Sequence, residues 1–158
     1  SAEQNHSLAA ETALELYTEH VANPKAEKLP EAAFTAIIRA CCLDGRVDQA
    51  LEILGSMKAA GEAPRLRSYS PLLEGLSREG RLSELVSTWE DASQRGVTLQ
   101  EKDYLWLVRA CTEAKDEGCF NRVMLGFMED VLQLATRASW EVLRAWFDSQ
   151  NSAVAAAA

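Results

Sequence analysis

Residues 32–66 read AAFTAIIRACCLDGRVDQALEILGSMKAAGEAPRL, and this stretch decides the fold because the chain repeats it. A shift of 35 residues places Phe34 on Tyr69 and Tyr69 on Tyr104. The same shift carries Asp-Gly-Arg at 44–46 onto Glu-Gly-Arg at 79–81. A fixed period of this length indicates that one structural unit is stacked several times.

Each unit is predicted to be a pair of helices. In 33–43 the apolar residues keep the i, i+3, i+4, i+7 spacing of an amphipathic helix. Gly45 then ends this helix, and a second apolar stripe occupies 47–57 before Gly61 and Pro64. The sequence has no stretch with the period of two that strands require. The predicted fold is therefore all-α, an α-solenoid in which each helix pair buries its apolar face against its neighbours.

The predicted organisation has six segments, of which the first and last are incomplete or featureless. The segments are a partial N-terminal repeat with its linker (1–31), two full repeats (32–66 and 67–101), a degenerate third repeat (102–135), a closing helix (136–150) and an alanine-rich tail (151–158). The first segment is expected to hold only a second helix, at Glu11–Val21. The third repeat has Lys115 and Asp116 where the other two have Gly-Arg. Ser139 is expected to cap the closing helix.

Composition excludes several classes of protein. With 158 residues, 47% apolar and 25% charged, the chain is neither a disordered tail nor a secreted mini-protein. It has no visible signal peptide and no apolar run near the ~18 residues that span a bilayer. We therefore expect a chain that is not secreted and has no membrane partner. A net charge of −8, if evenly spread, also argues against unselective binding to nucleic acid.

Residues that carry catalytic or metal chemistry are few. The four cysteines, at 41, 42, 111 and 119, contain no C-x-x-C pair, and adjacent Cys41 and Cys42 are poorly placed for one tetrahedral metal. We expect buried thiols in a reducing compartment. The two histidines are isolated, and no nucleophile–base pair or phosphate-binding loop is present. The prediction is that this chain is not an enzyme, with no catalytic residue, no metal site and no cofactor.

Helix geometry predicts where a ligand would bind. At 100° per residue, positions one, four, eight and twelve of each first helix lie opposite the apolar side, and stacking should bring them together along one groove. These positions are Ala32, Thr35, Arg39, Leu43, Arg67, Ser70, Glu74, Arg78, Lys102, Leu105, Arg109 and Glu113. They carry +3, which leaves −11 on the other 146 residues. Such a stripe suits RNA phosphates, although exposed helix faces also carry charge for solubility alone.

The repeat resembles a known family. Its period, the aromatic third position, the Gly-Arg turn and the terminal Gly and Pro are similar to those of the pentatricopeptide repeat. PRLRSYSPLLEGLSREGR (64–81) and ASWEVLRAWFDS (138–149) further resemble the last repeats and closing helix of protein-only ribonuclease P. In that family the repeats precede a zinc-binding hinge and a metallonuclease domain, whose motifs are not in this sequence. The resemblance therefore assigns Mg²⁺ and structural zinc to a parent nuclease and not to these residues.

The resemblance also implies a partner. The domain is expected to recognise folded precursor tRNA, at its elbow, while the nuclease domain cuts the 5′ leader. No small-molecule substrate is expected, the chain is expected to be a monomer, and the family works in mitochondria, plastids or the nucleus. Two alternatives stay open from the residues alone: a protein-binding α-solenoid scaffold and a repeat module for single-stranded RNA.

The family reads bases with position four and the residue near the repeat's end. Here the pairs are Thr35 with Arg65 and Ser70 with Gln100. A hydroxyl at position four is associated with purines, but the usual Asp or Asn partner is missing, and Leu105 offers no hydrogen bond. This broken code favours recognition of a folded shape with one or two exposed purines. The candidate RNA-binding residues are Thr35, Arg39, Arg65, Arg67, Ser70, Arg78, Gln100, Lys102 and Arg109.

Tryptophan side chains could also stack on bases. Trp89 and Trp140 lie on apolar stripes and are predicted to pack in the core. Trp106 lies beside Tyr104 and off the main stripe, so both core packing and base stacking stay open for it.

Overall fold

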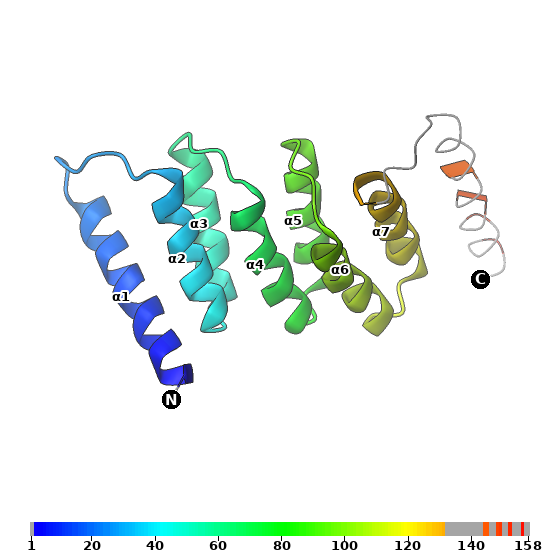
Figure 1. Cartoon of the computed structure of the whole chain (residues 1–158), viewed down its shortest axis with the longest axis horizontal. Helices are drawn as coiled ribbons and strands as arrows, with labels where there is room; N and C mark the ends of the chain where they lie inside the picture. Colours follow the sequence, from blue (N-terminus) through cyan, green and yellow to red (C-terminus); the bar gives the residue numbers. More distant parts are fainter. Residues whose placement is uncertain (1, 132–143, 146–147, 150–151, 153–155, 157–158) are drawn as a thin grey trace.

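The computed structural model describes residues 2–131, 144–145, 148–149, 152 and 156. Their secondary structure is entirely helical, which confirms the all-α prediction. The helices are α1 (Ala2–Ala22), α2 (Glu31–Leu43), α3 (Val47–Ala59), α4 (Leu66–Arg78), α5 (Leu82–Gln94), α6 (Glu101–Glu113) and α7 (Glu117–Asp130). Figure 1 shows them side by side in chain order, in the row expected of a solenoid. Most of the predicted closing helix (136–150), with Ser139, and most of the tail (151–158) lie outside the described residues.

The helices are arranged as three antiparallel hairpins, α2–α3, α4–α5 and α6–α7 (Figure 1). The first helices α2, α4 and α6 contact one another in sequence, and each second helix packs on its own first helix. The first helices therefore form a continuous row. The repeat boundaries at 32, 67 and 102 stay predictions from the sequence.

The aromatic residue at the third position of each repeat anchors the core. Phe34, Tyr69 and Tyr104 are all buried. The Tyr69 hydroxyl donates to Asp91 Oδ2 at 2.7 Å, and the Tyr104 hydroxyl donates to Asp130 Oδ2 at 2.6 Å. Each phenol thus fills the core and satisfies its polar atom at the end of the second helix.

The arginines of the two Gly-Arg turns also connect each hairpin to the helix or hairpin before it. Gly45 takes φ +72°, which costs glycine little and allows a tight turn between α2 and α3. Arg46 then donates to Glu11 of α1 at 3.0 Å, and Arg81 donates to Asp48 of α3 at 2.6 Å. The shared shape of these two turns therefore places one guanidinium of each of the first two repeats on a carboxylate of the preceding unit.

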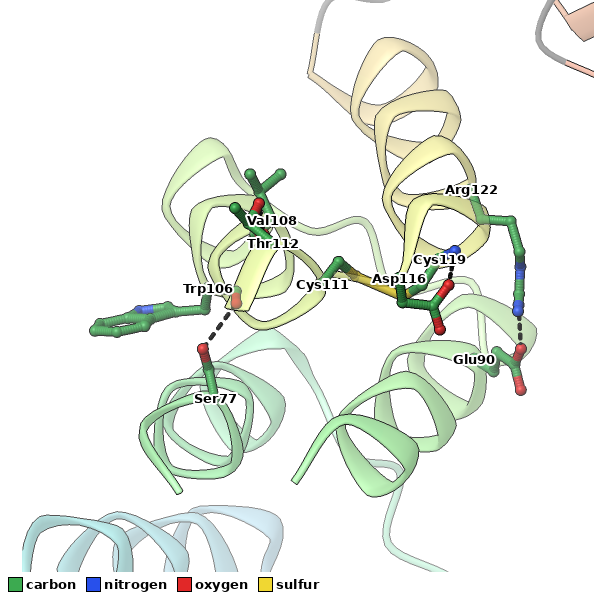
Figure 2. The surroundings of a disulfide bond; sticks show 9 residues. All are labelled: Ser77, Glu90, Trp106, Val108, Cys111, Thr112, Asp116, Cys119 and Arg122. Atoms are coloured by element: carbon green, nitrogen blue, oxygen red, sulfur yellow. Dashed lines mark hydrogen bonds and ion pairs between the residues drawn. A yellow bond between two sulfur atoms is a disulfide. The ribbon is translucent and has the colours of Figure 1, made fainter. Parts of the chain in front are cut away.

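The third hairpin is closed differently. Lys115, at φ 54°, stands where the other turns have glycine, and Asp116 caps α7 by accepting from the Cys119 N–H at 2.8 Å. Cys111 and Cys119 form a disulfide across this turn (Figure 2). Both residues are buried, as predicted, but the prediction that they are free thiols is wrong, because the turn brings their Cα atoms to 5.9 Å. The other two cysteines are free.

Helix α1 is longer than predicted, since it starts at Ala2 and not at Glu11. The additional residues are mostly good helix formers with no Gly or Pro among them. Tyr17 packs edge-on against Phe34, with ring centroids 6.1 Å apart, and so joins α1 to α2. Among the described residues, no helix is both long enough and apolar enough to cross a membrane.

Candidate nucleic-acid interface

A groove of about 910 Å³ crosses the row of first helices. It is lined by His6, Arg39, Cys42, Leu43, Arg65, Leu66, Arg67, Ser70, Pro71, Glu74, Gly75, Arg78, Lys102, Asp103 and Trp106. Six of the nine predicted RNA-binding residues are in this set: Arg39, Arg65, Arg67, Ser70, Arg78 and Lys102. Five cations and two carboxylates give the lining +3, within a chain of −8. The groove is therefore a basic surface on an otherwise acidic molecule.

Three of these cations lie outside any ion pair of the described structure, although the charge of Arg65 still acts on the Glu31 carboxylate. Arg39, Arg65 and Lys102 are exposed and form no ion pair or side-chain hydrogen bond within the described part of the chain. A guanidinium or ammonium that has no carboxylate partner can meet a phosphate without first giving up an interaction. These three residues are the most available anion-binding groups of the groove.

The start of α4 concentrates part of this charge. Arg65 immediately precedes α4, whose first turn has no acidic residue and contains Arg67. Lys102 lies in the first turn of α6 between two acidic residues, Glu101 and Asp103. The N-terminus of a helix carries a partial positive charge, so a cation there opposes the helix dipole. The same arrangement raises the positive potential at the start of α4, which favours an anion. The placement therefore serves binding better than it serves helix stability.

Arg67 is partly neutralised within the groove. Its Nε donates to Glu31 Oε1 at 2.9 Å, and a second guanidinium nitrogen contacts Glu31 Oε2. This hydrogen bonding lowers the pKa of the Glu31 carboxyl and raises the pKa of Arg67. A phosphate that binds Arg67 must share the guanidinium with Glu31.

Thr35 does not face the groove, and the expectation that position four lies on the open side is wrong there. Thr35 is 5% exposed. Its hydroxyl donates to Glu31 Oε1 at 2.9 Å and lies 2.8 Å from Ser68 Oγ, with which it shares a hydrogen bond. The close approach of α4 to α2 covers this position and uses its hydroxyl. We leave Thr35 out of the proposed interface.

Ser70 and Gln100 both donate hydrogen bonds to the buried carboxylate of Asp103. Ser70 lines the groove and donates to Asp103 Oδ1. Gln100, the residue before α6, is exposed outside the groove lining, and its backbone N–H donates to Asp103 Oδ2 at 2.9 Å. Asp103 is 1% exposed and thereby joins α4 to the start of α6. Ser70 can still accept a hydrogen bond from a ligand, whereas Gln100 does not reach the groove.

Trp106 lies in the groove, a position that the sequence left open. Its indole is half-buried, with Arg78 Cζ 5.2 Å and Arg109 Cζ 5.6 Å from its ring centroid. Arg109 is exposed and reaches the groove only through this contact. Position five falls at about 40° on the helical projection that selected positions one and twelve. That projection could therefore have found both Trp106 and its counterpart Pro71, which also lines the groove.

Cys42 is a further groove residue that the sequence did not single out. Burial raises the pKa of its thiol to about 12, so the side chain is neutral and adds no negative charge to the groove. The described residues contain no group of three metal-ligating side chains.

Comparison with known sequences identifies a matching family and two related proteins. Residues 1–154 match the family described as the pentacotripeptide-repeat region of PRORP. Proteinaceous RNase P 1, chloroplastic/mitochondrial, of Arabidopsis thaliana is 25% identical over 120 residues, which cover 76% of this chain and 21% of that protein. An Arabidopsis thaliana pentatricopeptide repeat-containing protein is 44% identical over 54 residues, 34% of this chain and 12% of that one. The chain thus matches only about a fifth or less of each relative's length.

Solved structures share the same architecture. The PPR domain of Arabidopsis thaliana protein-only RNase P 1, crystallised in complex with tRNA, superposes with a TM-score of 0.70 at 21% identity, covering 89% of this chain and 70% of that one. Nuclear proteinaceous RNase P 2 of the same plant gives 0.71 at 20% identity, covering 89% of this chain and 29% of that one. These likenesses confirm the predicted solenoid of pentatricopeptide-type repeats.

Proposed function

The chain belongs to the family of pentacotripeptide-repeat regions of PRORP, and from this membership we propose that it is a tRNA-binding module. The observation that carries the proposal is the groove, which is lined by five cations and two carboxylates in a chain of −8. A structure with the same fold, the PPR domain of protein-only RNase P 1, is a complex with tRNA. Both the charge of the groove and this fold-level likeness support tRNA as the ligand.

The binding energy would come mainly from phosphates. Arg39, Arg65 and Lys102 each offer an exposed cationic group outside any ion pair, and every phosphate that they neutralise releases condensed counterions. Affinity should therefore fall steeply as salt rises. The rest of the molecule carries a net −11, which disfavours RNA binding outside the groove.

The ligand that we propose is folded precursor tRNA, bound at its elbow. Position four offers little base reading, because Thr35 is buried, the Ser70 hydroxyl is donated to Asp103, and Leu105 is apolar. A basic groove with few base-reading groups recognises the shape of a backbone better than a linear sequence. Removal of the 5′ leader would fall to a separate nuclease domain that uses Mg²⁺ and a structural zinc. The present chain would bind the tRNA as a monomer and would contribute no catalytic residue.

The test measures binding of a folded precursor-tRNA transcript by fluorescence anisotropy. The groove variant combines Arg39→Glu, Arg65→Glu and Lys102→Glu, and we expect binding to be lost with the helical circular dichroism unchanged. The control combines Lys25→Glu, Lys115→Glu and Arg122→Glu, which change the net charge equally at exposed positions outside the groove. Because Arg122 pairs with Glu90, the helical circular dichroism of this variant is checked as well. Parent-like binding by the groove variant would refute the proposal. Equal losses in both variants would show that net charge and not the groove controls binding.

A competition experiment distinguishes recognition of a folded RNA shape from recognition of a linear RNA sequence. We expect unstructured RNA of the same length to compete poorly with folded tRNA. Equal competition would favour the alternative of a module for single-stranded RNA.

A further inference from the structure

In the groove, the indole of Trp106 is contacted by two guanidiniums from neighbouring repeats. Arg78 approaches the Trp106 ring from α4 and Arg109 approaches it from α6, at 5.2 and 5.6 Å from the ring centroid. Ser77 Oγ donates to the Trp106 carbonyl oxygen at 2.8 Å (Figure 2), which fixes the backbone of α6 against α4. In Figure 2 the indole itself extends away from this contact and from the neighbouring helices. The backbone of Trp106 is therefore held on a helix, while its ring is only half-buried.

Core packing does not account for Trp106. Its side chain is not part of the hydrophobic core or of the residues packed against it, whereas Trp89 packs on that core. Trp106 is also the only Phe, Tyr or Trp that lines the groove in the described part of the chain. A large aromatic side chain that contributes little to the core and faces a basic groove calls for a ligand-based explanation.

The two arginines that cover the ring are loosely held. Arg78 pairs with Glu74 at 2.7 Å and Arg109 pairs with Glu113 at 2.9 Å, and all four side chains are at least 43% exposed. An exposed ion pair or an exposed cation–π contact shifts an equilibrium by only about two- to fivefold. Stacking of a nucleobase on an aromatic side chain improves binding by about five- to a hundredfold. A base can therefore displace one guanidinium from the ring at a net gain.

We propose that Trp106 is a stacking site for one unpaired nucleobase of the bound RNA. The arginine that leaves the ring, Arg78 or Arg109, then meets the phosphate beside that base. The base must be unpaired because a base inside a duplex has both faces covered by its neighbours. This inference rests on the proposed function, since it assigns a particular contact within the same groove.

The test compares Trp106→Leu with the parent on two ligands. For a folded tRNA transcript, we expect Trp106→Leu to bind about five- to fiftyfold more weakly and Trp106→Phe to recover most of the loss. The slope of log affinity against log salt should be unchanged in Trp106→Leu, because no charge is removed. Inorganic polyphosphate, an anion without bases, should bind both proteins equally. Arg78→Gln, by contrast, should lower the salt slope by about one.

A spectroscopic measurement tests the same contact without relying on affinity. Stacking quenches indole emission, so tRNA should quench the parent's tryptophan fluorescence more than that of Trp106→Phe. Circular dichroism of each variant checks that the helices are intact. Matching quench in both proteins, tRNA binding by Trp106→Leu within twofold of the parent, or an equal loss for tRNA and polyphosphate would each overturn base stacking. Failure of the parent itself to bind tRNA would instead overturn the proposed function.

Discussion

Arg67 of α4 and Glu31 of α2 form an ion pair at the edge of the groove, with Arg67 Nε 2.9 Å from Glu31 Oε1. The carboxylate therefore performs two tasks. It joins two neighbouring repeats, and it holds a cation that a phosphate would otherwise bind. Stability and RNA affinity are in competition at this pair.

Glu31→Gln should strengthen RNA binding. The substitution leaves the Arg67 guanidinium without a charged partner, so a phosphate no longer competes with a carboxylate for it. We expect affinity for folded tRNA to rise by about two- to fivefold at low salt, with a smaller gain at high salt. Anisotropy titrations at two ionic strengths check this. The control is Glu62→Gln, which removes a carboxylate paired with Lys28 outside the groove and should leave binding unchanged.

The same carboxylate makes stability depend on pH. The Arg67 hydrogen bond lowers the pKa of Glu31 in the folded chain, so the ionised pair stabilises the fold above the ordinary pKa of a glutamate. This contribution is lost as pH falls through the lowered folded pKa. The free energies of unfolding of the parent and Glu31→Gln should therefore differ at pH 7, begin to converge below the ordinary glutamate pKa of ~4.3, and meet only below the lowered folded pKa. Urea denaturation at a series of pH values measures both. A difference that persists unchanged into acid would contradict the assignment.

Tyr69→Phe should weaken the second hairpin. The buried Tyr69 hydroxyl donates to Asp91, which also accepts from Lys58, so the carboxylate keeps a partner when the phenol is removed. We expect the free energy of unfolding to fall by about 1 kcal/mol. Urea denaturation checks this value. Tyr17→Phe is the matched control, because the Tyr17 hydroxyl has no hydrogen bond in the described structure and its loss should cost little.

The sequence predicted the solenoid well because the features that build it are periodic. The apolar stripes, the aromatic third position and the Gly-Arg turns recur at one spacing, and each recurrence fixes the same local structure. Helical projection also placed Arg39, Arg78 and Lys102 in the groove, since direction around a helix follows from residue number alone. These parts of the fold and site needed no tertiary information.

The parts that were missed depend on neighbouring repeats. Thr35 lies on the open side of an isolated helix and is covered only when α4 packs on α2. The contact of Trp106 with Arg78 joins residues of two repeats, and the Cys111–Cys119 disulfide depends on the conformation of a turn. A single sequence specifies local periodicity, whereas these features arise from how one unit packs on the next.

The Cys111–Cys119 disulfide should stabilise the third hairpin. Its cysteines are eight residues apart, and in the chain-entropy treatment closing a loop of that size contributes about 2–3 kcal/mol. The double variant Cys111→Ser, Cys119→Ser should unfold at correspondingly lower urea concentration. Reductant should lower the stability of the parent and leave that of the double variant unchanged. Maleimide labelling of the denatured, unreduced chain should modify two cysteines; labelling of four would show that the disulfide is absent.

Lys115 and Gly80 occupy equivalent turns. Substitutions at these two positions therefore test the free-energy cost of a positive φ for a residue with a Cβ. Both have positive φ, 54° at Lys115 and 68° at Gly80, a region where a residue with a Cβ is disfavoured by about 1–2 kcal/mol. A Cβ at Gly80 would meet no atom within 4 Å, so a substitution there changes backbone energy and not packing. Gly80→Lys should therefore lower the free energy of unfolding by about 1 kcal/mol, and Lys115→Gly should raise it by about 0.5 kcal/mol, less because glycine also gains entropy when unfolded. Urea denaturation of the two single variants and their combination measures both effects, which should add because the turns belong to different hairpins. A stabilising Gly80→Lys would show that the turn relaxes out of the left-handed region and that the glycine is not required there.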